Sequence, residues 1–429
     1  MREERRRLPV GLENFHQVMK DNYYYVDKTG LISELLRNGG MVNLFIRPRR
    51  FGKTLNMSML EHFFSIEGDQ SIFDGLEISK DTKLCEEHMG KYPVIFVSLK
   101  GINAGSYDTA FRLAVETIKG VAKKAKFLET SDKLDDHEKN DYQTLLDKDM
   151  DEATLFLSLK TLSELLEKHY ETKVIVLIDE YDVPLAKAFE NGYYDQMVFL
   201  IRNLLEQVLK TNNSLKFAVM TGCMRISKES IFTGLNNFTT FTITDVDFDE
   251  YFGFTHQEVH DLLTYYECTD KYESIKEWYD GYRFGNVNVY CPWDVVSYLR
   301  SLRADKEAIP QNYWVNTSGN AEVKEFIRQS KSATVKREIE CLMAGEIVTK
   351  TIRPELTYQD MYHSIENIWS VLFTAGYLTQ AGTGDGQMYK LRIPNLEIRE
   401  IFKTQIMEYF KESVEKDGDT LSKFCDALK

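Results

Sequence analysis

Short apolar runs alternate with amphipathic stretches over the first 240 residues of the chain. The apolar runs have the length of buried strands, and the stretches between them repeat apolar residues with a helical period. This alternation predicts an α/β fold in which helices cover a parallel sheet. We expect strands at Val42–Ile46, Pro93–Leu99, Lys173–Ile178 and Leu215–Met220, and helices near Lys53–Ser65, Ala104–Lys126, Thr154–Glu171 and Phe199–Lys210.

The pattern changes twice further along the chain. Residues 126–152 carry ten acidic residues against four lysines, which is typical of a surface excursion between core elements. Beyond about Asp249 helical patterns dominate, and the glycines of Tyr279–Gly285 and Gly376–Ile393 predict turns or hairpins. The expected division is a core with an N-terminal extension at 1–245, a mainly helical domain at 246–390, and a helical connector or tail at 391–429.

Composition narrows the class of protein. A net charge of −14 argues against a surface devoted to nucleic acid. The six cysteines contain no C-x-x-C pair, which favours reduced thiols over a disulfide framework or a zinc site. The first residues are charged, and no apolar run approaches the roughly 20 residues that cross a bilayer. We therefore expect a cytoplasmic protein with no membrane partner.

A phosphate-binding motif follows the first expected strand. Arg47–Thr54 occupies the place of a P-loop, G-x-x-x-x-G-K-[ST], in which backbone N–H groups and a lysine bind phosphate and a hydroxyl ligates Mg²⁺. Arg47 replaces the first glycine. Alone, Gly-Lys-Thr would more often be a chance tripeptide at a helix start, and a solvated surface role would suit the neighbouring arginines equally well. The expected nucleotide contacts are Arg49, Arg50, Phe51, Gly52, Lys53, Thr54 and Leu55.

Two acidic residues end the most apolar expected strand. Asp179 and Glu180 follow Val174–Ile178, and the C-terminal end of a buried parallel strand faces the ligand crevice. Asp179 can hold Mg²⁺ there, and Glu180 can polarise the attacking water. The pattern also fits a strand that merely leaves the core through acidic residues, but its pairing with the phosphate loop favours the functional interpretation. Asp182 fits a helix N-cap and receives no chemical role.

With both motifs placed, the chain resembles the AAA-ATPase-like family of bacterial and archaeal proteins, often fused to a C-terminal PD-(D/E)XK-type nuclease. The matching stretches are Leu8–Phe15, Tyr24–Thr29, Phe45–Leu60, Leu177–Leu185, Met220–Asn237, Trp278–Gly285 and Tyr290–Leu299. The resemblance implies a P-loop NTPase fold of the AAA or STAND type, followed by a mainly helical, winged-helix-like domain. An arginine at position 47 is usual in this family.

The resemblance also implies roles for two residues after the Leu215–Met220 strand. Thr221 and Arg225 would sense the γ-phosphate, although Arg225 is also placed for a helical ion pair with Glu229. The chain departs from the fused form of the family, because no D…(D/E)-x-K arrangement follows Pro394–Arg399. We expect the nuclease domain to be absent or truncated.

The expected function is Mg²⁺-dependent ATP hydrolysis that drives a rearrangement between domains. Lys53, Glu180 and Arg225 would be catalytic, and Thr54 and Asp179 would bind the metal. One alternative is a nucleotide-gated scaffold that binds ATP without turnover, and another is the ATPase module of a nucleic-acid-processing defence or mobile-element system. The expected partners are ATP and an unidentified protein. The overall charge does not support nucleic acid, and the sequence leaves oligomerisation open.

Overall fold

The chain divides into two compact units. The computed structural model describes residues 5–224, 237–314, 321–330, 333–353, 356, 358–361, 364–382 and 388–416. Unit 1 comprises Met1–Phe252 with Glu355–Gln359, and unit 2 comprises Gly253–Pro354 with Asp360–Lys429. Every residue that the sequence assigns to nucleotide or metal therefore belongs to unit 1.

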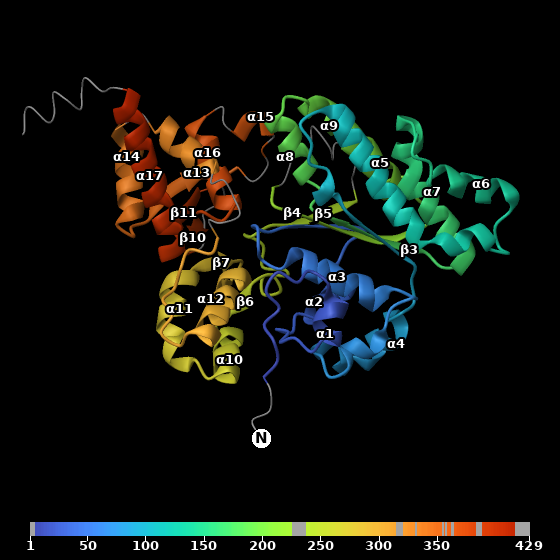
Figure 1. The fold of residues 1–429 in the computed structure, drawn as a ribbon, viewed down its shortest axis with the longest axis horizontal. Helices are drawn as coiled ribbons and strands as arrows, with labels where there is room; N and C mark the ends of the chain where they lie inside the picture. Colours follow the sequence, from blue (N-terminus) through green and yellow to red (C-terminus); the bar gives the residue numbers. More distant parts are fainter. Residues whose placement is uncertain are drawn as a thin grey trace, which may run out of the picture. The chain divides into compact units, whose positions relative to one another are not determined.

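Unit 1 is built on a five-stranded parallel sheet with the order β2-β3-β4-β1-β5 (Figure 1). Its strands are β1 Val42–Ile46, β2 Val94–Ser98, β3 Val174–Asp179, β4 Leu215–Gly222 and β5 Phe238–Phe241. All residues of β1 and β3 are buried, which explains why both strands are mainly apolar, with Asn43 in β1 and the terminal Asp179 of β3 as the polar exceptions. The four strands expected from the sequence are confirmed, and β5 is an addition. Because β4 lies between β1 and β3, the C-terminal end of β4 separates the phosphate-loop strand from the carboxylate strand.

Helices cover both faces of this sheet (Figure 1). On one side α3 packs against β2, β3 and β4, and on the other α5, α7 and α9 pack against the same three strands. The apolar stripe predicted for α7 is confirmed, because the leucines that form it are buried. The helices are α1 Phe15–Lys20, α2 Gly30–Asn38, α3 Lys53–Phe64, α4 Thr82–His88, α5 Tyr107–Lys124, α6 Asp136–Thr144, α7 Glu152–Tyr170, α8 Val183–Glu190 and α9 Tyr194–Leu209.

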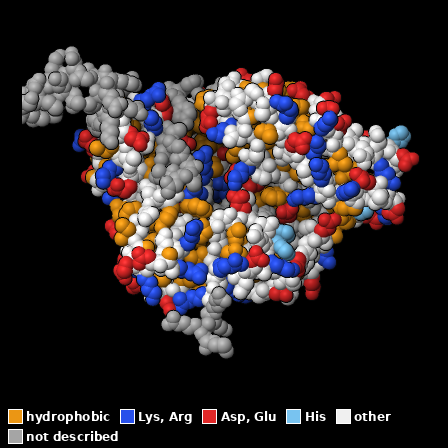
Figure 2. Space-filling model, in the orientation of Figure 1, with side chains coloured by type: hydrophobic (Ala, Val, Ile, Leu, Met, Phe, Trp, Pro, Cys, Tyr) orange, Lys and Arg blue, Asp and Glu red, His pale blue; other side chains and the backbone are white. Residues whose placement is uncertain are grey.

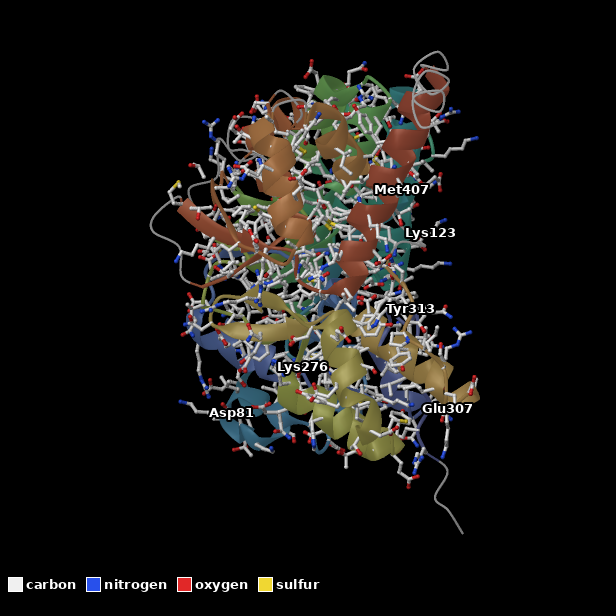
Figure 3. The ribbon with its side chains drawn as sticks, turned by 90° about the vertical axis from the view of Figure 1, so that its left-hand side faces the viewer. Asp81, Lys123, Lys276, Glu307, Tyr313 and Met407 are labelled. Atoms are coloured by element: carbon white, nitrogen blue, oxygen red, sulfur yellow. The ribbon has the colours of Figure 1, made fainter. Side chains whose placement is uncertain are left out.

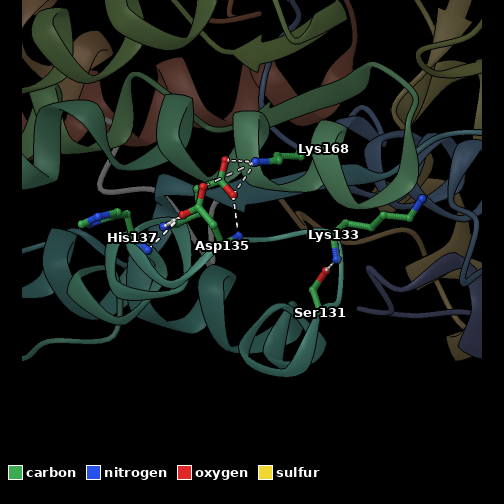
Figure 4. A network of polar contacts seen from close by, with 6 residues as sticks. Ser131, Lys133, Asp135, His137 and Lys168 are labelled. Atoms are coloured by element: carbon green, nitrogen blue, oxygen red, sulfur yellow. Dashed lines mark hydrogen bonds and ion pairs between the residues drawn. The ribbon is translucent and has the colours of Figure 1, made fainter.

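The acidic segment 126–152 contains a helix, α6, that its charge pattern did not predict. Asp135 caps α6 in a reciprocal arrangement with Glu138 (Figure 4). Lys168 of α7 donates to Glu138 at 2.6 Å, and the buried hydroxyl of Tyr142 donates to a backbone carbonyl of α5 at 2.8 Å. The excursion expected from the sequence is thus a helix fastened to α5 and α7 by a few specific contacts.

Unit 2 combines helices with two small antiparallel sheets, ordered β6-β8-β7 and β10-β11-β9. The strands are β6 Phe254–Thr255, β7 Tyr282–Phe284, β8 Val287–Tyr290, β9 Val348–Thr351, β10 Thr379–Gln380 and β11 Met388–Arg392. The hairpins expected around Tyr279–Gly285 and within Gly376–Ile393 are confirmed by the pairs β7–β8 and β10–β11.

The helices of this half are α10 His256–Tyr266, α11 Tyr272–Tyr279, α12 Pro292–Ala304, α13 Ala321–Gln329, α14 Ala333–Met343, α15 Tyr358–Met361, α16 Ile365–Thr374 and α17 Leu396–Lys416. Figure 3 shows Lys276 on α11 and Met407 on α17, and the Met407 residue is 55% exposed. Within the described parts of the chain, no helix has both the length and the apolar character needed to cross a membrane.

Candidate active site

The segment between β1 and α3 is a tight loop with two residues in left-handed backbone conformations. Arg50 has φ +72° and Gly52 has φ +79°. A Cβ built on Gly52 would meet no atom within 4 Å, so the backbone angle rather than space favours glycine there. Helix α3 begins at Lys53, directly after this glycine, so its first free N–H groups lie at the loop.

The ammonium group of Lys53 lies inside this loop. Lys53 is 5% exposed, and its Nζ donates to the carbonyl oxygens of Arg47 at 3.0 Å and Pro48 at 2.9 Å. The Sγ atom of Cys223 lies 3.3 Å from the same nitrogen. The loop therefore surrounds a cation, and a phosphate group held by the loop would compete with these carbonyls for its protons.

Three chain segments meet at the fully buried carboxylate of Asp179. Thr54 Oγ1, in the first turn of α3, donates to Asp179 Oδ2 at 2.9 Å. Thr221 Oγ1, near the end of β4, donates to Asp179 Oδ1. The structure thus brings both expected metal ligands into direct contact, and the expected sensor residue Thr221 contacts the same carboxylate.

Glu180 lies beside this carboxylate at the end of β3. Its backbone is left-handed, with φ +53°, and its N–H group lies 3.4 Å from Thr221 Oγ1. Burial raises the pKa of Glu180, and the charge of Asp179 raises it further, while Lys53 and Lys100 oppose the rise. A carboxylate with a raised pKa beside a second carboxylate is suited to accept a proton from water.

Lys100 belongs to the same charged group, although the sequence did not indicate it. It lies in the 3-10 helix η3, Leu99–Gly101, directly after β2, and Ser98 of β2 is opposite Asp179 of β3. Its Nζ lies 2.7 Å from Glu13 Oε1, and that hydrogen bond is the main reason why the pKa of Lys100 is raised. No motif marks Lys100, and only its position after the strand next to β3 could have pointed to it.

Arg47 is directed away from the phosphate loop. Its fully buried guanidinium donates to the carbonyl oxygens of Ile46 at 3.0 Å, Phe241 at 2.9 Å and Phe248 at 3.2 Å, and it lies 5.0 Å from the centre of the Phe252 ring. Burial lowers the pKa of Arg47 to about 10, although the negative charges of Asp245 and Asp249 oppose this decrease. Arg47 therefore fastens the segment that follows β5 to the end of β1.

The remaining predicted contacts differ in how accessible their side chains are. Phe51 is fully buried, so its ring is part of the core. Arg49 is exposed, whereas Arg50 and Leu55 are half-buried. Arg225 lies outside the described residues. The nucleotide contacts of these five residues stay predictions.

Asp182 does not have the helix-capping role that the sequence suggested. It occupies the N-cap position of α8, but its side chain makes no capping hydrogen bond. Instead Oδ2 accepts from the N–H groups of Cys223 at 2.9 Å and Met224 at 3.0 Å. The sequence could not indicate this contact, because it joins residues more than forty positions apart.

Comparison with known proteins agrees with this geometry. The family described as predicted AAA-ATPase matches residues 9–232 of the 429-residue chain, a span that contains the phosphate loop, Asp179, Glu180 and Thr221. A similar protein from Azotobacter chroococcum mcd 1, named "Uncharacterized protein in vnfD 5'region", is 27% identical over 413 residues, which cover 92% of this chain and 69% of the relative. The chain belongs to the predicted AAA-ATPase family.

Proposed function

We propose that the chain binds ATP with Mg²⁺ and hydrolyses it at the C-terminal ends of β1, β4 and β3. The observation that carries the proposal is the 2.9 Å contact between Thr54 Oγ1 and Asp179 Oδ2. The two residues are 125 positions apart in the sequence, yet the fold joins the hydroxyl of the phosphate loop to the acid at the end of the carboxylate strand. A chance Gly-Lys-Thr tripeptide would have no reason to lie there.

The groups at this place fit a nucleoside triphosphate and its metal ion. Thr54 and Asp179 offer a hydroxyl and a carboxylate, the oxygen ligands that Mg²⁺ prefers. Bound there, the ion would neutralise charge that develops on the phosphates. Lys53 would exchange the carbonyls of Arg47 and Pro48 for phosphate oxygens. Arg49 and Arg50 would add positive charge at the rim of the loop.

Glu180 would be the general base. Its raised pKa makes the carboxylate a better proton acceptor than an exposed glutamate. Its left-handed backbone is uncommon for a residue with a side chain, and such conformations concentrate at functional sites. Thr221, held to Asp179, and Arg225, four residues further along the chain, would sense the γ-phosphate.

The topology of unit 2 supports a winged-helix-like domain within it. Helix α14 leads to strand β9, and helix α16 leads to the hairpin β10–β11, with β11 between β10 and β9. The middle of α16 is buried, and Trp369 in it packs on Phe326 and beneath Lys350. A helix that reads DNA must instead present side chains to the groove.

A protein is therefore the better candidate partner than DNA. On the face drawn in Figure 2, basic side chains of unit 1 are interspersed with acidic ones, and the chain as a whole carries a net charge of −14. We propose that ATP turnover in unit 1 changes how unit 2 engages this protein partner. A gel shift titrated with salt tests the alternative, because DNA binding through phosphates must weaken steeply as salt rises.

The direct test of the reaction compares phosphate release and ATP binding in matched variants. Glu180→Gln should bind ATP normally but release phosphate at least about 100-fold more slowly, since general bases contribute that order of rate. Glu171→Gln is the control, because Glu171 also has a left-handed backbone, with φ +57°, and precedes β3 at its opposite end. Lys53→Ala should lose ATP binding, whereas Lys173→Ala, at an exposed position, should not.

Two results would contradict the proposal. Equal rates in the wild type and Glu180→Gln, with ATP bound to both, would exclude Glu180 as the base. Tight Mg²⁺-dependent ATP binding by a wild type that releases no phosphate, even with its partner present, would make the chain a nucleotide-gated scaffold.

A further inference from the structure

Asp182 is a buried carboxylate to which neither motif assigns a function. It is 4% exposed, and its Oδ1 atom has no hydrogen-bond partner among the described residues. Burial raises the pKa of Asp182, while three backbone N–H groups, those of Cys223, Met224 and Asp182 itself, and the charge of Lys53 oppose the rise. A buried carboxyl group is costly unless its surroundings compensate it, so the contacts that Asp182 does make are informative.

Asp182 is part of a clamp between residues 179–182 and residues 221–224. Besides the bonds from Cys223 and Met224 to Asp182, the hydroxyl of Tyr181 donates to the carbonyl of Met224 at 2.6 Å. The two segments can approach this closely because residue 222 is glycine. A Cβ at this position would lie 2.5 Å from the Tyr181 ring. The two residues that follow β4 are therefore held through the N–H groups of Cys223 and Met224 and through the carbonyl group of Met224.

The same clamp touches the phosphate loop. Cys223, whose N–H group bonds to Asp182, places its Sγ atom 3.3 Å from Lys53 Nζ. Lys53 also contributes to the electrostatic environment of Asp182 and of the Cys223 thiol. Lys53 thus contacts the clamp directly through the side chain of Cys223, and Asp182 accepts from the backbone N–H group of that same residue.

We propose that Asp182 is a positioning residue that holds Cys223 and Met224 in place while Lys53 changes its partners. It thereby keeps the segment that leads to Arg225 aligned with Asp179 and Glu180. The proposal rests on the proposed function, because Lys53 is taken to exchange its present partners, which include Cys223 as well as the carbonyls of Arg47 and Pro48, for phosphate oxygens. It predicts that loss of Asp182 impairs turnover and leaves nucleotide affinity largely unchanged.

The first arm of the test needs no nucleotide. Alkylation of cysteines with iodoacetamide, followed by mass spectrometry, should show Cys223 modified about tenfold faster in Asp182→Ala, because two hydrogen bonds to a charged acceptor are lost. Cys85 serves as the internal reference, since it is also a half-buried thiol of unit 1 whose pKa is raised by burial. Asp182→Asn, which keeps an acceptor oxygen but not the charge, should give an intermediate rate.

The second arm measures ATP affinity and turnover in the same variants. The kcat of Asp182→Ala should fall about tenfold or more, because small misplacements of catalytic groups are costly, and its Kd for ATP should stay within about threefold of the wild type. Asp151→Asn is the control, because Asp151 is an exposed aspartate that caps α7 and accepts from Thr154 at 2.8 Å. Asp151→Asn should change neither the rate of Cys223 alkylation nor the Kd and kcat for ATP.

The outcomes separate this proposal from the proposed function. A wild type that neither binds nor hydrolyses ATP refutes the proposed function, and the alkylation arm still decides whether Asp182 holds Cys223. Unchanged Cys223 alkylation in both Asp182 variants overturns the positioning role, as does an equal increase at Cys85. Faster Cys223 alkylation with unchanged kcat overturns the link to turnover. If Asp182→Ala does not fold, Asp182→Asn decides both arms.

Discussion

Replacing Arg47 by alanine tests whether the residue at the first glycine position of the phosphate loop stabilises the fold rather than binding nucleotide. In the wild type its guanidinium spans three backbone carbonyls, two of which belong to residues 194 and 201 positions away. Alanine would leave these carbonyls without the donor that joins them. The segment from Phe241 to Phe252 would then lose its fastening to the end of β1.

The expected loss of stability follows from these contacts. A hydrogen bond from a charged donor contributes roughly 1.5–3 kcal/mol, so three contribute roughly 5–9 kcal/mol. Burial opposes them: a pKa lowered from 12.5 to about 10 means that the fold disfavours the charged form by roughly 3 kcal/mol. We therefore expect Arg47→Ala to lower the free energy of unfolding of unit 1 by roughly 2–6 kcal/mol.

The two units can be followed separately in one experiment. All four tryptophans, Trp278, Trp293, Trp314 and Trp369, lie in unit 2, so tryptophan fluorescence in urea reports that unit. Hydrogen exchange of peptides that cover β1 and β5 reports unit 1. The variant should exchange faster in β5 and in residues 241–252, with little change in the fluorescence midpoint.

Arg47→Lys is the informative control. Lysine keeps the charge but donates from a single nitrogen, which cannot span the carbonyls that the planar guanidinium reaches. It should destabilise unit 1 nearly as much as alanine, and the folded fraction should bind ATP with an affinity close to that of the wild type. A loss below about 1 kcal/mol in Arg47→Ala, with unchanged exchange in β5, would refute the structural role. Loss of ATP binding by a fully folded Arg47→Lys would refute the claim that the side chain faces away from the nucleotide.

The remaining predictions concern buried or clustered charges. Because burial and its acidic neighbour raise the pKa of Glu180, phosphate release should fall on the acid side with an apparent pKa above 4.5, and a pH–rate profile with a lower midpoint would contradict this. The positive charge of Lys100 opposes that rise, so Lys100→Ala should move the acid limb to higher pH, whereas Glu13→Gln, which leaves the cation in place, should not. In unit 2, burial and the neighbouring Asp294 raise the pKa of Glu397 to about 10. The folded state then keeps a proton that the unfolded state loses, so stability should decline as pH rises from about 4.5 towards 10. Urea midpoints from tryptophan fluorescence between pH 5 and 9 should show this decline, and Asp294→Asn should flatten it; an equal slope in the variant would contradict the assignment.

The sheet could be predicted from the sequence where its strands are buried on both faces. β1 and β3 are buried throughout and almost entirely apolar, and such a run has few alternatives to a central parallel strand. β5 escaped prediction because it is a four-residue edge strand, FTTF, with a single buried residue. α6 escaped because Tyr142 is its one buried residue, while its surface is dominated by charge. The repeat of apolar residues is weak in both segments, and tertiary contacts decide the structure.

The residues of the candidate site also divide into those whose position could be predicted from the sequence and those whose contacts could not. That Lys53 and Thr54 lie close to Asp179 and Glu180 could be predicted, because each pair belongs to a short motif at the end of a strand and parallel strands bring such ends together. The side chain of Arg47 donates to three backbone carbonyls, two of them far away in the sequence, and carbonyls carry no sequence signal. The same holds for Asp182, whose side chain accepts only from backbone N–H groups.

The backbone of Arg47 and the side chain of Asp182 both contact the end of β4 or the residues that directly follow it. The N–H group of Arg47 donates to the carbonyl of Gly222 at 3.1 Å, so the entrance of the phosphate loop is tied to the segment that Asp182 holds on its other side. β1 and β3 do not pair with each other, because β4 lies between them. One route from Lys53 to Glu180 therefore runs through residues 221–224, beside the direct contact of Thr54 with Asp179. Substitutions in that segment should consequently separate nucleotide binding from turnover, whereas equally conservative substitutions within β1 should weaken both together.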